Sequence, residues 1–335
     1  MRQQITIKDI AKALNISPST VSRALQDHDD ISKKTREKVQ AYAKAHHYKP
    51  NAIALSLKMQ RTNIIGVIVP NMVHNFFASV LAGIDDAARK KGYNVILCQT
   101  SEQYEREVDC LDTLLASHIS GLLISLSKST TNFDHLKEAL QEDLPIVMFD
   151  RVSPEIKTDQ VVTDDYSGAY AAVCHLIETG CKRIAFYGSP EHLTITQERK
   201  RGYLDALKNH GIEPDNDIMF ECDSREAAIE LTPKVMQLKN CPDAFFTVND
   251  YTASGVIHSI KRAGLKIPED VSVCGFGDGV VARTSDPELT TVEQNGYEIG
   301  LTACMRLIDK IEKKDTDSIT RTVIKTRLIK RNSTK

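Results

Sequence analysis

Short β-branched runs alternate with amphipathic stretches over residues 63–335, and this alternation restricts the fold more than any other feature of the chain. The first half predicts buried parallel strands at Ile64–Val69, Val95–Cys98, Leu122–Ile124 and Ile146–Phe149, with helices between them near 77–91, 103–117 and 133–142. The second half predicts strands near 183–187, 218–221, 244–248 and 271–274, with helices near 165–179, 199–210, 225–238 and 251–263. A final helix at about 295–313 and a strand near 322–325 follow. This pattern predicts an α/β body of two doubly wound subdomains with parallel sheets.

Charge is divided unevenly along the chain. Residues 1–62 contain 12 Lys and Arg against 5 Asp and Glu, a net charge of +7, whereas residues 63–335 carry −9. Clustered Lys and Arg gain affinity for phosphates by releasing the counterions condensed on nucleic acids. The basic segment therefore indicates a polyanion-binding module joined to a body with another task. The alternative is a merely solvated basic face.

The basic segment has the helix pattern of a helix-turn-helix. Thr6 is placed to cap a first helix, with Asp9 at the third helical position. After a three-residue turn, Ser17 and Pro18 start a second helix. Its outer face consists of Pro18, Ser19, Ser22 and Arg23. A third helix is expected from Ser32 to about residue 46, which completes a minimal DNA-binding unit.

These residues resemble the headpiece of the lac repressor and purine repressor (LacI/GalR) family of bacterial transcription regulators. The resemblance rests on TIKDIA at 6–11, SPSTVSR at 17–23, TREKV at 35–39, YKPN at 48–51 and Leu57-Lys58, and it continues through almost the whole chain. It implies a DNA-binding headpiece at 1–49 and a hinge helix with its linker at 50–62. An effector-binding and dimerisation domain is implied at 63–335.

The resemblance also assigns positions that contact DNA. The expected set is Thr6, Ser17, Pro18, Ser19, Thr20, Ser22, Arg23, Ser32, Asn51, Ala54, Leu57 and Lys58. Within it, Pro18, Ser19 and Arg23 fall at base-reading positions, whereas the hydroxyls of residues 6, 22 and 32 fall at phosphate-contacting positions. Pro18 has no hydrogen-bonding side chain, so base discrimination there must come from shape or apolar contact.

Residues 51–58 form too short a segment to be a stable helix alone in water. The resemblance makes them a hinge helix, in which Leu57 of each of two subunits enters the minor groove at a kinked base step, beside Lys58. Such a wedge unstacks one step at a cost of a few kcal/mol, offset by the contacts that a bent duplex allows. The alternative is that Leu57 is an ordinary core residue.

In proteins similar to this one, the chain crosses between two subdomains three times, here near 161–163, 289–293 and 321–325. The resemblance therefore assigns about 63–161 plus 291–325 to an N-subdomain and about 162–290 to a C-subdomain. The result is a two-lobed body like that of the periplasmic binding proteins. Ligands of open α/β sheets bind beyond the carboxyl ends of the strands, and in such a body these ends line the cleft between the lobes.

Carboxylates, amides and aromatic side chains follow the predicted strands. This combination suits a polyhydroxylated ring, because each hydroxyl both donates and accepts while the apolar ring face stacks on an aromatic side chain. By resemblance, the effector pocket contains Phe76, Phe77, Asp150, Arg199, Asn249, Asp278 and Gln294. A sugar or sugar derivative is the expected effector.

Two departures from the family pattern bear on this pocket. The run Gly275-Phe276-Gly277-Asp278 places a glycine where the family usually has an acid, and it moves the carboxylate by one residue. The loop Gly188–Gln197 differs in length and residue type from that of the purine-binding relative, so a nucleobase effector is not supported.

Enzyme and metal-site motifs are weak. A dinucleotide fingerprint begins at Gly275, but Val280 stands where its third glycine should be. Phosphate-binding loops, nucleophile elbows and zinc-protease motifs do not occur. The eight cysteines form no C-x-x-C pair, so reduced thiols are expected. The sequence thus predicts no catalytic residues, no metal and no cofactor.

A cytoplasmic protein without a membrane partner is expected, because no apolar run approaches ~20 residues and the N-terminus lacks the apolar segment of a signal peptide. The rival hypothesis is a periplasmic-type sugar-binding protein without a DNA function, which would need an export signal instead of a helix-turn-helix.

The expected assembly is a homodimer on a palindromic double-stranded operator, because a two-fold site requires two headpieces. Effector binding should change the angle between the lobes and thereby order or melt the hinge segments, which makes the chain an effector-controlled transcriptional repressor.

Overall fold

The structure, a computed structural model, describes residues 5–46, 48, 62–314 and 318–335. The chain divides into two compact units, Met1–Thr62 and Asn63–Lys335, which we call the head and the body.

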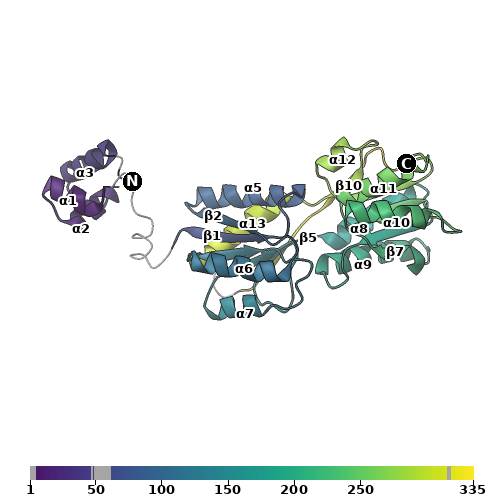
Figure 1. The fold of residues 1–335 in the computed structure, drawn as a ribbon, viewed down its shortest axis with the longest axis horizontal. Helices are drawn as coiled ribbons and strands as arrows, with labels where there is room; N and C mark the ends of the chain where they lie inside the picture. The colour runs from purple at the N-terminus through teal and green to yellow at the C-terminus, as the bar shows by residue number, and fades with distance from the viewer. Residues whose placement is uncertain (1–4, 47, 49–61, 315–317) are drawn as a thin grey trace. The chain divides into compact units, whose positions relative to one another are not determined.

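The described residues of the head form the helices α1 (Ile7–Leu14), α2 (Pro18–Leu25) and α3 (Lys33–Ala45), as predicted (Figure 1). Their apolar faces enclose a small core of Ile10, Ala11, Val21, Ala24, Val39 and Ala43. Each helix begins at a hydroxyl residue whose side chain accepts a backbone N–H of the first turn, namely Thr6, Ser17 and Ser32. Thr6 and Asp9 form a complete capping box.

The first sheet of the body has six parallel strands in the order β11-β5-β4-β3-β1-β2. The strands are β1 (Ile64–Val69), β2 (Asn94–Gln99), β3 (Gly121–Ile124), β4 (Ile146–Phe149), β5 (Asp159–Thr163) and β11 (Arg321–Ile324). One face packs against α5 (Asn75–Lys90) and α13 (Gly296–Ile311), and the other against α6 (Tyr104–Ala116) and α7 (Asp134–Gln141) (Figure 1). We call this layer structure the N-lobe.

The second sheet, in the C-lobe, has the order β12-β10-β9-β8-β6-β7, and β12 alone runs antiparallel. Its strands are β6 (Ile184–Gly188), β7 (Met219–Glu221), β8 (Ala244–Thr247), β9 (Ser272–Gly277), β10 (Thr290–Glu293) and β12 (Arg327–Ile329). The helices are α8 (Asp165–Glu178), α9 (Thr194–Asn209), α10 (Arg225–Met236), α11 (Asp250–Arg262) and α12 (Val280–Thr284), with the short turn η1 at Asn216–Ile218. Helices α8 and α9 cover one face, and α10 and α11 the other. The predicted α/β class with two doubly wound sheets is confirmed.

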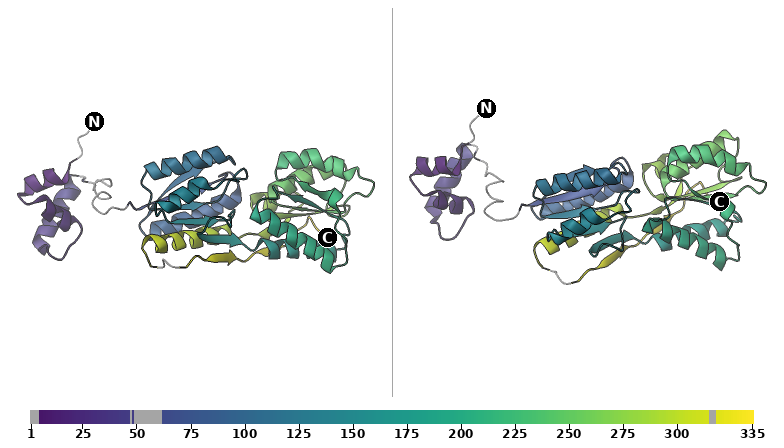
Figure 2. Two further views of the ribbon diagram at one scale, coloured as in Figure 1. Left: turned by 90° about the horizontal axis from the view of Figure 1, so that it is seen from below. Right: turned by 60° about the horizontal axis from the view of Figure 1, so that its bottom comes forward.

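Three crossings join the lobes, after β5, β10 and β11 (Figure 2). They are bonded to one another: the Thr326 hydroxyl donates to the Asp164 carbonyl (3.2 Å), and the Asn295 amide donates to the Lys325 carbonyl (2.8 Å). The lobes therefore share one hydrogen-bonded hinge.

The lobe boundaries differ from the prediction by a few residues. Strand β5 keeps the chain in the N-lobe to Thr163 rather than 161, and β10 belongs to the C-lobe, so the return crossing follows Glu293 rather than 290. The tail 327–335 also belongs to the C-lobe, because β12 pairs with β10 and the buried Ser333 hydroxyl donates to the Val273 carbonyl (2.6 Å).

Candidate functional site

The exposed face of the head carries the residues predicted to contact DNA. Ser17, Pro18, Ser19 and Arg23 of the second helix are exposed, and Thr20 and Ser22 are half-buried. Thr6 and Ser32 are exposed N-caps of α1 and α3. The free backbone N–H groups at helix N-termini are suited to hydrogen-bond phosphate oxygens. The remaining predicted contacts, Asn51, Ala54, Leu57 and Lys58, lie outside the described residues.

Carboxylates beside Arg23 partly balance its charge. The Arg23 guanidinium lies 3.9 Å from Asp30, whose carboxylate is also 3.3 Å from the His28 ring. All three side chains are about half exposed or more, so this pair is screened by water and easily broken. Arg23 is therefore free to exchange Asp30 for another acceptor.

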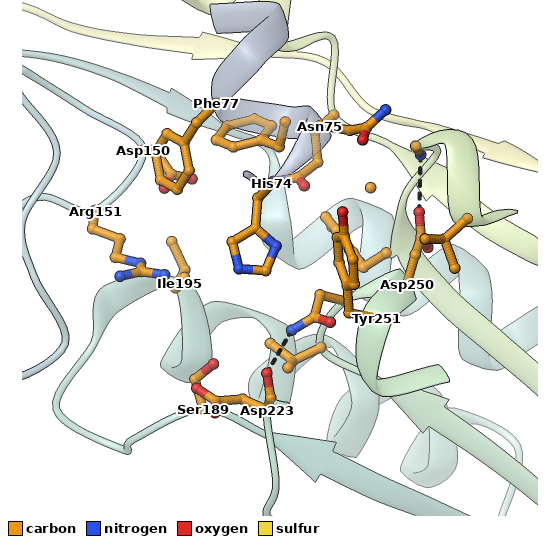
Figure 3. A pocket seen from close by; sticks show the side chains of 18 of the residues that line it. His74, Asn75, Phe77, Asp150, Arg151, Ser189, Ile195, Asp223, Asp250 and Tyr251 are labelled. Atoms are coloured by element: carbon orange, nitrogen blue, oxygen red, sulfur yellow. Dashed lines mark hydrogen bonds between the residues drawn. The ribbon is translucent and has the colours of Figure 1, made fainter. Parts of the chain in front are cut away.

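The body has a pocket between its lobes, and six of the seven predicted effector residues line it. They are Phe76, Phe77, Asp150, Arg199, Asn249 and Gln294. Phe76 and Phe77 come from the first turn of α5, and Asp150 follows β4, so the N-lobe supplies three of the six (Figure 3). Arg199 and Asn249 come from the C-lobe, and Gln294 lies in the crossing after β10.

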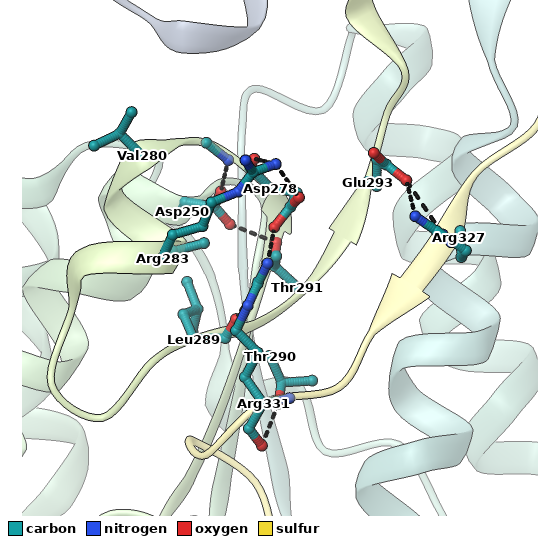
Figure 4. A network of polar contacts seen from close by, with 12 residues as sticks. Asp250, Asp278, Val280, Arg283, Leu289, Thr290, Thr291, Glu293, Arg327 and Arg331 are labelled. Atoms are coloured by element: carbon teal, nitrogen blue, oxygen red, sulfur yellow. Dashed lines mark hydrogen bonds and ion pairs between the residues drawn. The ribbon is translucent and has the colours of Figure 1, made fainter.

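Asp278 does not line this pocket but an adjoining hollow, which shares Asn75, Phe76 and Gly277 with it. Its carboxylate accepts from Arg331 (2.5 Å) and pairs with Arg283 (2.7 Å) (Figure 4). Asp278 has a left-handed backbone (φ 54°), and this turn directs its side chain toward the C-terminal tail. Arg331 is 53 residues away in sequence, so no local pattern indicates the pairing.

Two buried carboxyls face the pocket, one from each lobe. Asp150 and Asp250 are each 4% exposed. Burial, which disfavours the charged form, raises the pKa of Asp150 to about 6, and burial likewise raises the pKa of Asp250 to about 6. Asp250 accepts from the Thr291 hydroxyl (2.5 Å) and the Gly279 backbone N–H (3.0 Å), and Asp150 accepts from Ser125 at 3.4 Å.

Each guanidinium or ammonium group that lines the pocket has a carboxylate partner in the described structure. Arg151 pairs with Glu102 at 2.7 Å, within the N-lobe. Arg199, 4% exposed, pairs with buried Asp165 at 2.7 Å, within the C-lobe. The two members of this second pair are 34 residues apart in sequence. The adjacent acid, Asp164, caps α8.

One of these ion pairs crosses from lobe to lobe. The Lys128 ammonium, in the loop after β3, lies 2.6 Å from Asp223, which follows β7. The main chain of Lys128 is held as well, because its N–H donates to Glu102 (2.9 Å) and its carbonyl is 2.7 Å from the His192 ring. Lys128 thus connects both lobes at the rim of the pocket.

Aromatic side chains form the apolar part of the pocket. The His74 and Tyr251 rings meet edge to face with centroids 4.7 Å apart, and the Arg199 guanidinium lies 3.8 Å from the centroid of Phe276. Burial lowers the pKa of His74, and nearby Arg151 lowers it further. His74 is therefore neutral at pH 7, and the pocket combines ring faces with hydrogen-bonding groups around them.

Sequence reasoning missed several lining residues. Lys128, Ser189 and Asp223 each follow a strand by a few residues, so the strand-end signal was available for them. His74 and Tyr251 also follow strands, β1 and β8, by a few residues, but their contact with each other had no local signal because it joins segments far apart in the chain.

Neither a metal site nor a membrane span is present among the described residues. They contain no cluster of three or more His, Cys, Asp or Glu side chains arranged to hold a metal ion. None of their helices is long and apolar enough to cross a membrane.

A basic helix-turn-helix head on a two-lobed body with an interlobe pocket defines a ligand-responsive transcription regulator. Residues 6–51 match the family described as bacterial regulatory proteins, lacI family, and residues 62–332 match the periplasmic binding proteins and sugar binding domain of LacI family. The chain belongs to the LacI family of bacterial regulatory proteins.

Individual relatives extend over nearly the whole chain. The HTH-type transcriptional repressor CytR of Escherichia coli (strain K12) is 34% identical over 331 residues, which cover 98% of this chain and 96% of CytR. The lac repressor dimer bound to operator and the anti-inducer ONPF has a TM-score of 0.88 at 26% identity, covering 99% of both chains. A complex of the transcriptional regulator CelR with cellobiose has a TM-score of 0.75 at 27% identity, covering 98% of this chain and 100% of CelR.

Proposed function

We propose that this chain is a homodimeric repressor of a two-fold symmetric operator, controlled by a sugar or sugar derivative that binds between its lobes. The observation that carries the proposal is the pocket, because residues of both lobes line it. One hydrogen-bonded hinge joins these two lobes. A ligand that contacts both lobes has a different affinity for each lobe angle, so it must shift the equilibrium between these geometries.

The exposed side chains of the head support the DNA-binding part. Pro18, Ser19 and Arg23 are proposed to face the bases, with Arg23 leaving Asp30 for a base edge. Thr6, Ser17, Thr20, Ser22 and Ser32 are proposed to hold phosphates. Asn51, Ala54, Leu57 and Lys58 are proposed to act in the minor groove at the operator centre, on the family resemblance alone.

The pocket residues support a carbohydrate effector. Asp150, Asn249 and Gln294 offer acceptors and donors, and Phe76 and Phe77 offer ring faces. The CelR structure, which contains cellobiose, is similar to this chain over almost its full length. The pocket is proposed to bind its ligand without transforming it, and the protein to act in the cytoplasm, where its operator is.

Replacing Arg23 tests the DNA-binding part. Arg23→Ala should weaken binding to a duplex that the wild-type protein selects from random sequence by at least about fivefold, because a bidentate base contact contributes about 1–3 kcal/mol. Binding to unselected duplex should fall much less. The readout is fluorescence anisotropy at several salt concentrations, with Arg262→Ala in the body as the matched control.

The wild-type protein should also lose affinity steeply as salt rises. A wild-type protein that enriches no sequence, or equal losses on selected and unselected duplex for Arg23→Ala, would contradict the proposal.

A further inference from the structure

The carboxylate of Asp250 occupies space that two glycines of β9 leave free. A Cβ atom on Gly275 would lie 2.5 Å from Oδ1 of Asp250, and a Cβ on Gly277 would lie 3.0 Å from Oδ2. Gly277 has φ 144°, a backbone conformation that other residues rarely adopt, and it lines the pocket beside Asp250. The missing side chain at 277 therefore leaves Asp250 uncovered toward the pocket.

Asp250 is the acid whose carboxylate lies beside Gly277 at the pocket. The neighbouring acid, Asp278, is occupied by Arg283 and Arg331 outside this pocket. Asp250 is held in place by the Thr291 hydroxyl and the Gly279 N–H, and each carboxylate oxygen retains a further lone pair. On the N-lobe, Asp150 is the corresponding carboxyl, with one long hydrogen bond.

The charges around these two acids favour an uncharged ligand. Lys128, Arg151 and Arg199 are each neutralised by a carboxylate at 2.6–2.7 Å. His74 is neutral at pH 7 because burial lowers its pKa. Asp150 and Asp250 have no such cationic partner among the ion pairs of the described residues. A phosphate would have to approach two carboxyls without an unpaired cation to receive it.

We propose that Asp150 and Asp250 grip an uncharged, hydroxyl-rich effector from opposite lobes, and that the pocket rejects the phosphate ester of the same molecule. This inference rests on the proposed function and narrows its ligand class. Donated hydroxyl hydrogen bonds stabilise the ionised form of both carboxyls, whereas a ligand phosphate destabilises it. The burial that raises the pKa of both acids strengthens this discrimination, because water screens the charges less.

The first test uses the wild-type, full-length protein. Its thermal stability is measured with ribose, glucose, cellobiose and adenosine, and with the phosphate monoester of each. A ligand at 100 times its dissociation constant stabilises a protein by about 2.7 kcal/mol, so a binder is readily detected. The expected result is that an uncharged compound stabilises the protein and its phosphate ester binds at least tenfold more weakly. A phosphate ester that binds as well as its parent, or better, would overturn the inference.

The second test assigns the C-lobe acceptor. Asp250→Asn should weaken the compound found above at least tenfold, measured by calorimetry, and Gly277→Ala should do the same because its Cβ crowds Asp250. Asp278→Asn is the matched control and should leave ligand affinity within twofold. If Asp250→Asn does not fold, the affinity of Gly277→Ala and the wild-type comparison with phosphate esters still test the proposal. Unchanged ligand affinity in a folded Asp250→Asn or Gly277→Ala protein would overturn the assignment.

The two failures are distinguishable. If none of the eight compounds stabilises the protein, the carbohydrate part of the proposed function fails and this inference fails with it. If an uncharged compound binds and Asp250→Asn binds it with unchanged affinity, only the inference fails and the proposed function stands.

Discussion

The surroundings of Asp150 favour its protonated form, and this lowers the stability of the folded protein at neutral pH. Asp150 is 4% exposed, and burial raises its pKa to about 6 from 3.8. Well below pH 3.8 the carboxyl is protonated in both the folded and the unfolded chain, so its environment does not change the stability. As the pH rises from 3.8 to about 6, the unfolded chain ionises this carboxyl while the folded protein keeps it protonated, so stability is lost across this window. Above about pH 6 the carboxyl is ionised in both states, and the loss stays constant.

Asp150→Asn should therefore stabilise the protein at pH 7.5 by about 1–3 kcal/mol, and this gain should decrease steadily as the pH falls from about 6 to 4. Asparagine also suits the left-handed backbone at this position (φ 58°). Denaturant unfolding between pH 4 and 8 measures the effect, with exposed Asp85→Asn as control. A gain that is independent of pH would show that ionisation of Asp150 is not its cause.

Single residues of the pocket were predictable where they follow a strand closely. Asp150 directly follows β4, and Asn249 lies two residues after β8. Phe76 lies further along the chain from β1, in the first turn of α5. The pairing of Asp278 with Arg331 could not be predicted, because only the C-terminal tail brings Arg331 to it. The position of Asp250 in the pocket depends on the absent side chain of Gly277, which requires the fold to be known.

At the scale of elements, α5 and α13 pack at backbone contact distance. A Cβ on Gly300 would lie 1.9 Å from the Val80 carbonyl oxygen, and one on Gly83 would lie 2.1 Å from the Tyr297 carbonyl oxygen. The Tyr297 hydroxyl also donates to Asp86 of α5 (2.9 Å). This close packing against α5 therefore fixes the position of α13, which begins at the crossing after β10.

Gly300→Ala should destabilise the body by about 3 kcal/mol or more, because the backbone of α5 cannot give way as a flexible side chain can. Asp85→Ala, on the exposed face of α5, is the control and should change stability by no more than about 0.5 kcal/mol. Chemical denaturation of the full chain provides the measurement. A loss of less than 1 kcal/mol for Gly300→Ala would contradict this packing.

The sequence predicted most elements to within two or three residues, because apolar runs and helical periodicity are local signals. Helix α9 begins at Thr194, whereas the sequence predicted a start at 199. The true start was missed because the N-cap residue, Leu193, has no side chain that could cap the helix. Strands β5, β10 and β12 and helix α12 were not predicted. All four are short, and β10 and β12 pair with each other although they lie more than thirty residues apart in the chain.

At the scale of the whole molecule, the chain combines a DNA-binding head with a body whose lobes are linked by one hinge and by contacts across the pocket. Lys128 and Asp223 hold the lobes together directly, and the Tyr251 hydroxyl reaches the Val73 carbonyl at 3.4 Å. A ligand in the pocket adds its own contacts with both lobes to these direct contacts between them. The class and the two-lobed fold were predictable from the sequence through its resemblance to the LacI family, whereas the contacts between the lobes were not.

The most direct measurement of the central claim is the operator affinity of the full-length protein with and without a saturating amount of the uncharged compound found by thermal stability. We expect the compound to change the operator dissociation constant at least fivefold, and the operator duplex to change the dissociation constant of the compound by the same factor, because coupling between two sites is reciprocal. An operator affinity that is identical with and without the bound compound would contradict the account.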